Sequence, residues 1–199
     1  MTSTITVTGS GSASAAPDAM RLLVAVRTTA MSVPRALAGV AAGVDRLGEV
    51  ARAFTSADRI ASHGLSVWPH HTESEGDVFQ ASHTFEIFCE SLEKSGELVT
   101  ALAEALQHEL AIESVEPVIA DASGLARRAR ELAFDDARSK AAELAALAGR
   151  SLGEVESIVE EGGHDRPMVM AASSRSGGMP FEPGLSKVTA RVRVTWQLD

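Results

Sequence analysis

Apolar and polar residues alternate with a period of two over several stretches of the chain, which is the pattern of half-buried β-strands. The alternation is clearest at the C-terminal end, where the apolar positions are Val188, Ala190, Val192, Val194, Trp196 and Leu198. Similar patterns predict strands near residues 4–8, 20–26, 59–71, 78–90, 112–119 and 155–159. Because several of these strands carry one polar face, we expect mixed or antiparallel sheets rather than a parallel sheet buried on both faces.

Three other stretches repeat their apolar residues every three or four positions, which is the period of an amphipathic helix. They predict helices over about residues 33–54, 95–109 and 123–148. Ser32 is a suitable N-cap for the first helix, and Pro34 is tolerated in its first turn. Gly149 is placed to end the third helix in the left-handed conformation. The inward positions of the third helix are mostly alanine, so we expect it to approach a sheet closely.

The elements expected over residues 18–119 follow the order strand-helix-strand-strand-helix-strand, which is typical of a ferredoxin-like unit. Residues 120–199 add the third helix and the C-terminal strands. The predicted fold class is therefore α+β, in one domain spanning residues 1–199, because no clear linker separates the two parts. Two Gly/Ser-rich stretches are expected to lack regular structure: residues 9–18, which would end the first strand, and residues 161–186, apart from the apolar patch at 168–170.

Charge and cysteine content exclude several classes of protein. The chain has 27 acidic and 18 basic residues, and its net charge of −9 argues against nucleic acid as a partner. A single cysteine, Cys89, excludes an internal disulfide and a multi-cysteine metal site. The N-terminus lacks a basic start followed by an apolar run, and no stretch approaches the roughly 18 apolar residues of a membrane helix. We therefore expect a cytoplasmic protein without a transmembrane segment.

Four segments together resemble one known family. They are residues 5–13 (ITVTGSGSA) with Pro17 and Asp18, residues 129–145 (ARELAFDDARSKAAELA), residues 148–153 (AGRSLG) ahead of a strand, and residues 183–184 leading into the last strand. The chain resembles the SIMPL-domain family, a domain of unknown function found in bacterial periplasmic immunogenic proteins and proteins tied to oxidative-stress defence. The resemblance covers nearly the whole chain and implies an α+β fold and a tendency to form homo-oligomers, but no catalytic motif. Many members are exported behind a leader, and none is visible here.

Few residues suggest chemistry. The glycine-rich residues 9–11 follow a strand, as a phosphate loop would, but a second strand comes next instead of a helix, so a turn is favoured. His63 and His83 fall on the apolar faces of neighbouring strands, yet two ligands without a placed carboxylate make a weak metal site, and hydrogen-bonded core histidines are favoured. Cys89 shares a face with His83 but lies too far along the strand for a dyad, so we expect a small buried residue.

The outward face of the third helix is charged. Arg127–Glu131 and Asp136–Lys140 are pairs at the i,i+4 spacing that brings side chains together on a helix surface. Asp135 is the neighbour of Asp136 on the same helix. The pattern is typical of a solvated face, not of a pair of catalytic carboxylates.

Because we find no catalytic constellation, we interpret the chain as a non-enzymatic assembly or interaction protein, with self-association as its expected partnership; the resemblance links it to stress defence. No catalytic, cofactor-binding or metal-binding residues and no cofactor are expected. The alternative is a small-ligand binding module with a pocket between the sheet and the helices, lined by Trp68, His83 and Phe85. A third hypothesis is a hydrolase that uses His83 or Cys89.

Overall fold

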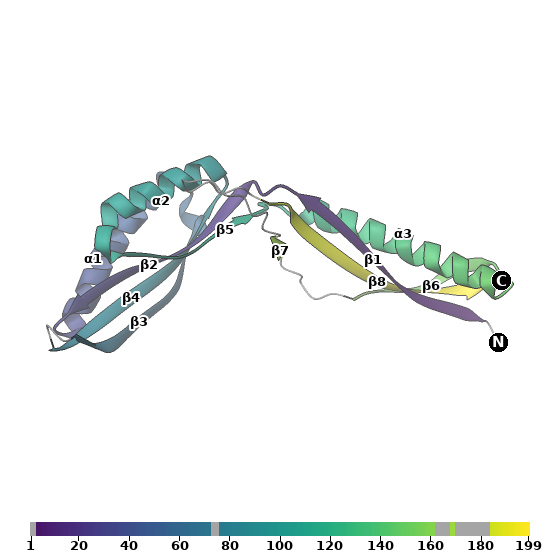
Figure 1. Cartoon of the computed structure of the whole chain (residues 1–199), viewed down its shortest axis with the longest axis horizontal. Helices are drawn as coiled ribbons and strands as arrows, with labels where there is room; N and C mark the ends of the chain where they lie inside the picture. The colour runs from purple at the N-terminus through teal and green to yellow at the C-terminus, as the bar shows by residue number, and fades with distance from the viewer. Residues whose placement is uncertain (1–2, 73–75, 162–167, 170–183) are drawn as a thin grey trace. The chain divides into compact units, whose positions relative to one another are not determined.

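The chain forms two compact units (Figure 1), described in a computed structural model over residues 3–72, 76–161, 168–169 and 184–199. Unit 1 combines Met1–Pro17 with Asp121–Asp199, and unit 2 is Asp18–Ala120. The described residues contain three α-helices and two antiparallel sheets, which confirms the predicted α+β fold class. Unit 2 contains the segment 18–119, and the predicted division into a ferredoxin-like segment within one domain over residues 1–199 stays a prediction.

Unit 2 has the ferredoxin-like order of elements. They are β2 (Ala19–Ala30), α1 (Val33–Ala51), β3 (Ile60–Thr72), β4 (Gly76–Cys89), α2 (Leu92–Leu106) and β5 (Leu110–Val118), with single 3-10 turns at Ala57–Arg59 and Gln107–Glu109. The sheet order is β3-β4-β2-β5, and every neighbouring pair is antiparallel. This is the strand order that two consecutive split βαβ connections produce.

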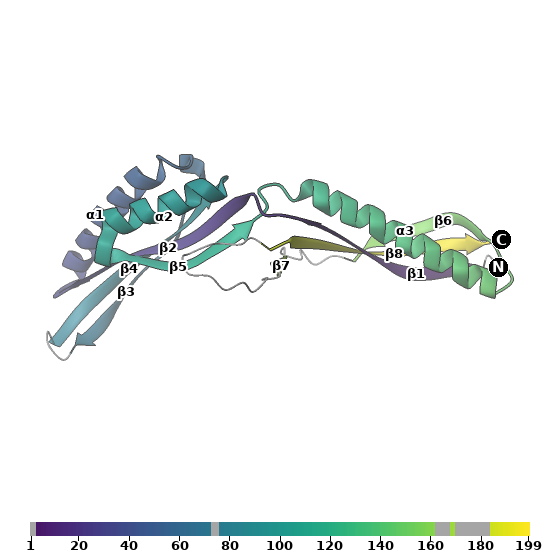
Figure 2. The same cartoon turned by 45° about the horizontal axis from the view of Figure 1, so that its top comes forward.

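Helices α1 and α2 lie on the same face of the unit 2 sheet (Figure 2). The core between these helices and the sheet is built from aliphatic side chains and one aromatic ring: Met20, Leu22, Val24, Val26, Leu47, Ala51, Phe85, Ile87, Leu98, Leu102 and Leu106. Burial of such side chains is the main source of stability for a unit of this size.

Unit 1 consists of one long helix on a second sheet. Its elements are β1 (Thr4–Ala15), α3 (Ser123–Leu147), β6 (Leu152–Glu160), β7 (Met168–Val169) and β8 (Ser186–Leu198). The sheet order is β1-β8-β6, and the two residues of β7 also pair with β8. Helix α3 packs along β1 and β8 (Figure 1).

The Gly/Ser-rich stretch after residue 8 was expected to end the first strand, and this expectation is wrong. Strand β1 continues to Ala15 and pairs with β8 without a break from Thr4↔Gln197 to Ala15↔Ser186. The turn expected at residues 9–11 is therefore extended strand. Two long-range partners outweigh the weak strand propensity of glycine and serine here, because β8 completes the ladder and α3 packs directly on the glycines.

The backbone of α3 packs directly against the glycines of β1. A Cβ atom added at Gly9 would lie 2.1 Å from the carbonyl oxygen of Ala133 and 2.5 Å from the amide nitrogen of Ala137. At Gly11 it would lie 2.2 Å from the carbonyl oxygen of Ala129 and 2.4 Å from the amide nitrogen of Ala133. Since these neighbours are backbone atoms, they cannot move aside singly, and only glycine fits at these two positions.

The helix side of this contact is a stripe of alanines. Ala129, Ala133, Ala137, Ala141 and Ala145 recur every four residues and are all fully buried or nearly so. Around them pack Val192, Val194 and Trp196 of β8. The sequence prediction that small inward residues let this helix approach a sheet closely is confirmed.

The helix ends follow local capping signals. Helix α2 begins at Leu92, three residues before the predicted start, because the Ser91 hydroxyl accepts a hydrogen bond from the Lys94 amide at 3.3 Å. Helix α3 ends at Leu147, and Gly149, two residues later, has the left-handed φ of 69° that was predicted for the residue ending this helix.

Two further predictions have partial outcomes. On α3, Asp136 pairs with Lys140 as predicted, whereas Glu131 pairs with Arg128 and not with Arg127. The loop predicted over 161–186 falls mostly on residues 162–167 and 170–183, outside the described part of the chain. Within that range, 168–169 form β7 and Ser186 begins β8.

We predict that Gly9→Ala and Gly11→Ala each destabilise unit 1 by about 3 kcal/mol, since the added methyl group would force α3 away from the sheet. Chemical denaturation followed through the buried Trp196, in a Trp68→Phe background, measures the effect on unit 1. Gly124→Ala in the first turn of α3 is the matched control, because a Cβ there meets nothing within 4 Å. If Gly9→Ala were as stable as this control, the close contact would be refuted.

Candidate functional site

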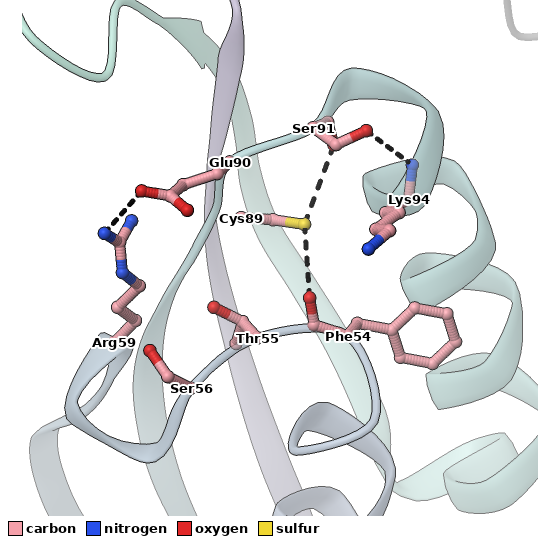
Figure 3. A pocket seen from close by; sticks show the side chains of 8 residues that line it. All are labelled: Phe54, Thr55, Ser56, Arg59, Cys89, Glu90, Ser91 and Lys94. Carbon is pink, nitrogen blue, oxygen red and sulfur yellow. Dashed lines mark hydrogen bonds and ion pairs between the residues drawn. The ribbon is translucent and has the colours of Figure 1, made fainter.

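A cavity of about 320 Å³ lies in unit 2 where the segment after α1, the end of β4 and the start of α2 meet (Figure 3). It is lined by Phe54, Thr55, Ser56, Arg59, Cys89, Glu90, Ser91 and Lys94. Most of these groups already have partners within the cavity wall. Arg59 forms an ion pair with Glu90 and stacks over the ring of Phe88, 5.1 Å from its centroid.

Cys89 is completely buried beneath this cavity. Its Sγ lies 3.6 Å from the carbonyl oxygen of Ser91 and 4.0 Å from that of Phe54. Both neighbours are acceptors for the weak hydrogen bond that a thiol donates. Cys89 is thus the small buried residue that the sequence predicted, and its sulfur is shielded from solvent.

A second groove, of about 420 Å³, lies between α1 and the sheet of unit 2. Its apolar part is formed by Val44, Leu47, Ile60 and Phe85, and its charged part by Asp45, Glu49 and Arg52, with Gly48 and Ala57 completing the lining. Of the three residues predicted to line a ligand pocket, Phe85 is among those that line this groove. An apolar floor with a few charged groups at its margin is typical of small-molecule sites.

The three residues predicted to line a ligand pocket are separated by the pleat of the sheet. His83 and Phe85 lie side by side on β4, with ring centroids 4.3 Å apart. Trp68 pairs with Gln80, and the preceding residue Val67 packs against the core on the helix-covered face. Because successive side chains of a strand point to opposite faces, Trp68 lies on the other face of the sheet. The structure brings His83 and Phe85 together and leaves Trp68 apart.

The partner of His83 is a residue that sequence reasoning missed. The Ser62 hydroxyl lies 2.6 Å from His83 Nε2, at hydrogen-bond distance. His63, which the sequence placed on an apolar face as a core histidine, is instead exposed in a β-bulge, since Ser62 faces Phe85 and Gly64 already faces Thr84. A bulge shifts every following side chain to the opposite face of the sheet. Apart from Gly64, nothing in the local sequence indicates this bulge.

Residues of metal-binding type do not cluster in the described ranges. Among residues 3–72, 76–161, 168–169 and 184–199, no three His, Cys, Asp or Glu side chains lie close enough to hold a metal ion. Over the same ranges, no helix combines the length and the apolar content required to cross a membrane.

The β1 edge of the unit 1 sheet is closed by side chains of α3. Asp136 Oδ2 accepts hydrogen bonds from the Ser10 amide at 2.8 Å and from Lys140 Nζ at 2.6 Å. Lys140 Nζ also lies 3.4 Å from the carbonyl oxygen of Thr8. These bonds, first that of Lys140 and then that of the Ser10 amide, lower the pKa of Asp136 below its ordinary value.

The opposite edge of the same sheet is formed by β6. Helix α3 reaches β6 mainly through an ion pair in which Arg130 Nε lies 2.7 Å from Glu160 Oε1. Val155 and Ile158, on the helix side of β6, are consequently exposed by 43% and 56%, and Val159, which pairs with Arg193 on the other face, is exposed by 55%. Within the described residues nothing pairs with the outer side of this strand.

Comparison with known proteins adds a family but no activity. The family model SIMPL, described as a protein of unknown function (DUF541), matches residues 5–196. The match covers both units, including the glycines of β1 and the alanine stripe of α3. No curated protein matches the chain.

We predict that Asp136→Asn lowers the free energy of unfolding by about 1 kcal/mol near neutral pH, the net value of a charge-assisted hydrogen bond at a partly exposed site. A carboxyl with a lowered pKa in the folded state stabilises above its ordinary value and loses this contribution as pH falls. The difference between wild type and variant should therefore shrink below pH 3.8. Denaturation curves at a series of pH values test this, with Asp135→Asn as the control expected to change little. A difference independent of pH would contradict the assignment.

Proposed function

The chain belongs to the SIMPL family, a family of unknown function, and we propose that it acts as an assembly protein that pairs with a second copy of itself through strand β6. The observation that carries this proposal is the exposed apolar edge strand formed by Val155, Ile158 and Val159. A strand of this kind exposes unpaired N–H and C=O groups together with apolar side chains, and it tends to pair with another strand.

The position of α3 explains why β6 is available. The alanine stripe places the helix over β1 and β8. The apolar face of α3 therefore packs on these two strands and not on β6. Val155 and Ile158 pair with Trp196 and Val194 of β8, whose side chains are buried under α3. The helix-side face of β6 therefore continues the core outward, and within the described part of the chain it has no cover of its own.

The charges around β6 favour a second copy in antiparallel orientation. Glu154 and Glu156 lie in the first half of the strand, whereas Arg130 and Arg193 lie at its far end, paired with Glu160 and Glu161. Because these arginines are already paired, the far end carries no net charge, and antiparallel pairing of two β6 strands keeps apart the two acidic halves that parallel pairing would bring together. Such an interface is isologous and closes as a dimer instead of extending into a fibre.

The two edges of the unit 1 sheet are not equivalent, and this difference determines which strand is available to pair with a second copy. The middle of β1 is occupied by Asp136 and Lys140, which bond to the backbone of Ser10 and Thr8. A strand approaching β1 would have to displace both side chains. The free edge of unit 1 is thus β6, which supports pairing of β6 in one copy with β6 in a second copy.

A second candidate function is binding of a small ligand in the groove between α1 and the sheet. The observation that favours it is the apolar floor formed by Ile60, Phe85 and Leu47 beside the charged residues Glu49 and Arg52. An apolar fluorescent dye should bind to the wild type and bind more weakly after Phe85→Ala. Equal binding by both proteins would exclude this groove as the site.

We predict that size exclusion coupled to light scattering gives a molar mass above the 20.8 kDa of one chain. Ile158→Lys should weaken the association at least about tenfold, because it removes apolar burial of roughly 1.5 kcal/mol and adds a charge at the interface. Leu65→Lys, at an equally exposed strand position in unit 2 (56%), is the matched control. A wild-type protein that stays monomeric at high micromolar concentration, or a control that dissociates equally, would refute pairing through β6.

A further inference from the structure

The hydrogen-bonded pair of Ser62 and His83 has the geometry of a nucleophile and its general base. Oγ and Nε2 are 2.6 Å apart, and a serine is activated when a neighbouring imidazole can take its proton. We propose that Ser62 is a nucleophile for small activated esters with apolar acyl groups, and that His83 is its base. This activity is distinct from assembly through unit 1, since both residues belong to unit 2.

The two side chains differ in exposure in the way the chemistry requires. Ser62 is exposed on the edge strand β3, where a substrate can reach it. His83 is half-buried on β4, and its ring packs against Phe85 at a centroid distance of 4.3 Å. The packed ring holds Nε2 toward the serine, so the base is positioned before a substrate binds.

The groove beside α1 adjoins this pair. Ile60 and Phe85 line the groove, Ser62 is two residues after Ile60 on β3, and His83 is two residues before Phe85 on β4. Residues two apart on a strand share a face, so the pair continues the floor of the groove. An apolar acyl chain lying on Ile60 and Phe85 would present its carbonyl carbon near Ser62.

A β-bulge directly follows the serine in β3. Ser62 faces Phe85 and Gly64 faces Thr84, so His63 is the extra residue. A bulged residue stands outside the regular ladder of hydrogen bonds, and bulges recur beside active sites. We assign the backbone N–H of His63, which directly follows the nucleophile, to the oxyanion.

The reaction balances with water as the second substrate. Ser62 Oγ attacks the ester carbonyl carbon while its proton passes to His83 Nε2, and the C–O bond to the alcohol then breaks as the alcohol takes that proton. Water attacks the resulting acyl-serine, giving one proton to His83, which returns it to Ser62 as the carboxylic acid leaves. Among the described residues no carboxylate bonds to the other ring nitrogen of His83, so turnover should be slow compared with a full triad.

A covalent probe tests the pair without requiring fast turnover. A fluorophosphonate with an alkyl chain reacts by forming a bond from Ser62 Oγ to phosphorus and breaking the P–F bond, with fluoride leaving and the proton passing through His83 to solvent. Intact-mass and peptide mass spectrometry of the full chain should show one adduct, at Ser62. His83→Gln, which keeps the size of the side chain but not its basicity, should slow labelling about 10²–10⁴-fold.

Two controls separate chemistry from folding. Ser66→Ala removes another exposed serine of β3 and should label at the wild-type rate, while Ser62→Ala should give no adduct. Circular dichroism and thermal melting verify that each variant is folded. Absence of an adduct at Ser62 in the wild type, or labelling that His83→Gln leaves unchanged, would overturn the proposal. Dye binding in the groove without labelling would overturn the nucleophile alone and leave the ligand-binding function standing.

Discussion

Unit 1 depends on one close contact, the seating of helix α3 directly on the backbone of β1 at Gly9 and Gly11. The contact leaves no room for a single Cβ atom on the strand, and it needs alanine at four-residue intervals on the helix. It fixes the height of the helix above the sheet and the line that the helix follows along it. Packing at this density is sensitive to the addition of even one methyl group.

The placement of α3 over β1 has unequal consequences for the two edges of the sheet. At β1 the helix is close enough for Asp136 and Lys140 to bond to the strand backbone and blunt that edge. At β6 the helix contributes an ion pair from Arg130 and leaves Val155 and Ile158, on its own side of the sheet, exposed. One constraint thus accounts both for the closed edge and for the edge through which we propose that copies pair.

The core of unit 2 contains larger side chains than the core of unit 1, and grooves are present between its elements. Its helices rest on leucine, valine and phenylalanine side chains, and grooves remain where α1 and the start of α2 meet the strands. The Ser62–His83 pair lies at one of these grooves because a bulge in β3 sets the register. The chemistry proposed for unit 2 and the assembly proposed for unit 1 therefore have separate structural origins.

The periodicity of the sequence predicted the α+β class, the three helices and the ferredoxin-like order, because these depend on local hydrophobic pattern. It failed at residues 9–15, where glycine and serine form a strand only because β8 and α3 are present. It also missed Ser62 as the partner of His83, since a bulge of one residue changes the facing of side chains without altering composition. The edge bonding of Asp136 was equally hidden, because a carboxylate on a charged helix face looks solvated until its neighbour strand is known.

Amide hydrogen exchange measured across a dilution series tests the central claim most directly, since it reports on both edges of the unit 1 sheet in one experiment. The account predicts that the amides of β6 that do not bond to β8 are protected at concentrations where the protein is associated and exchange quickly on dilution. The Ser10 amide in β1, bonded to Asp136, should be protected at every concentration. Exchange in β6 that is independent of concentration, or rapid exchange at Ser10, would contradict the account.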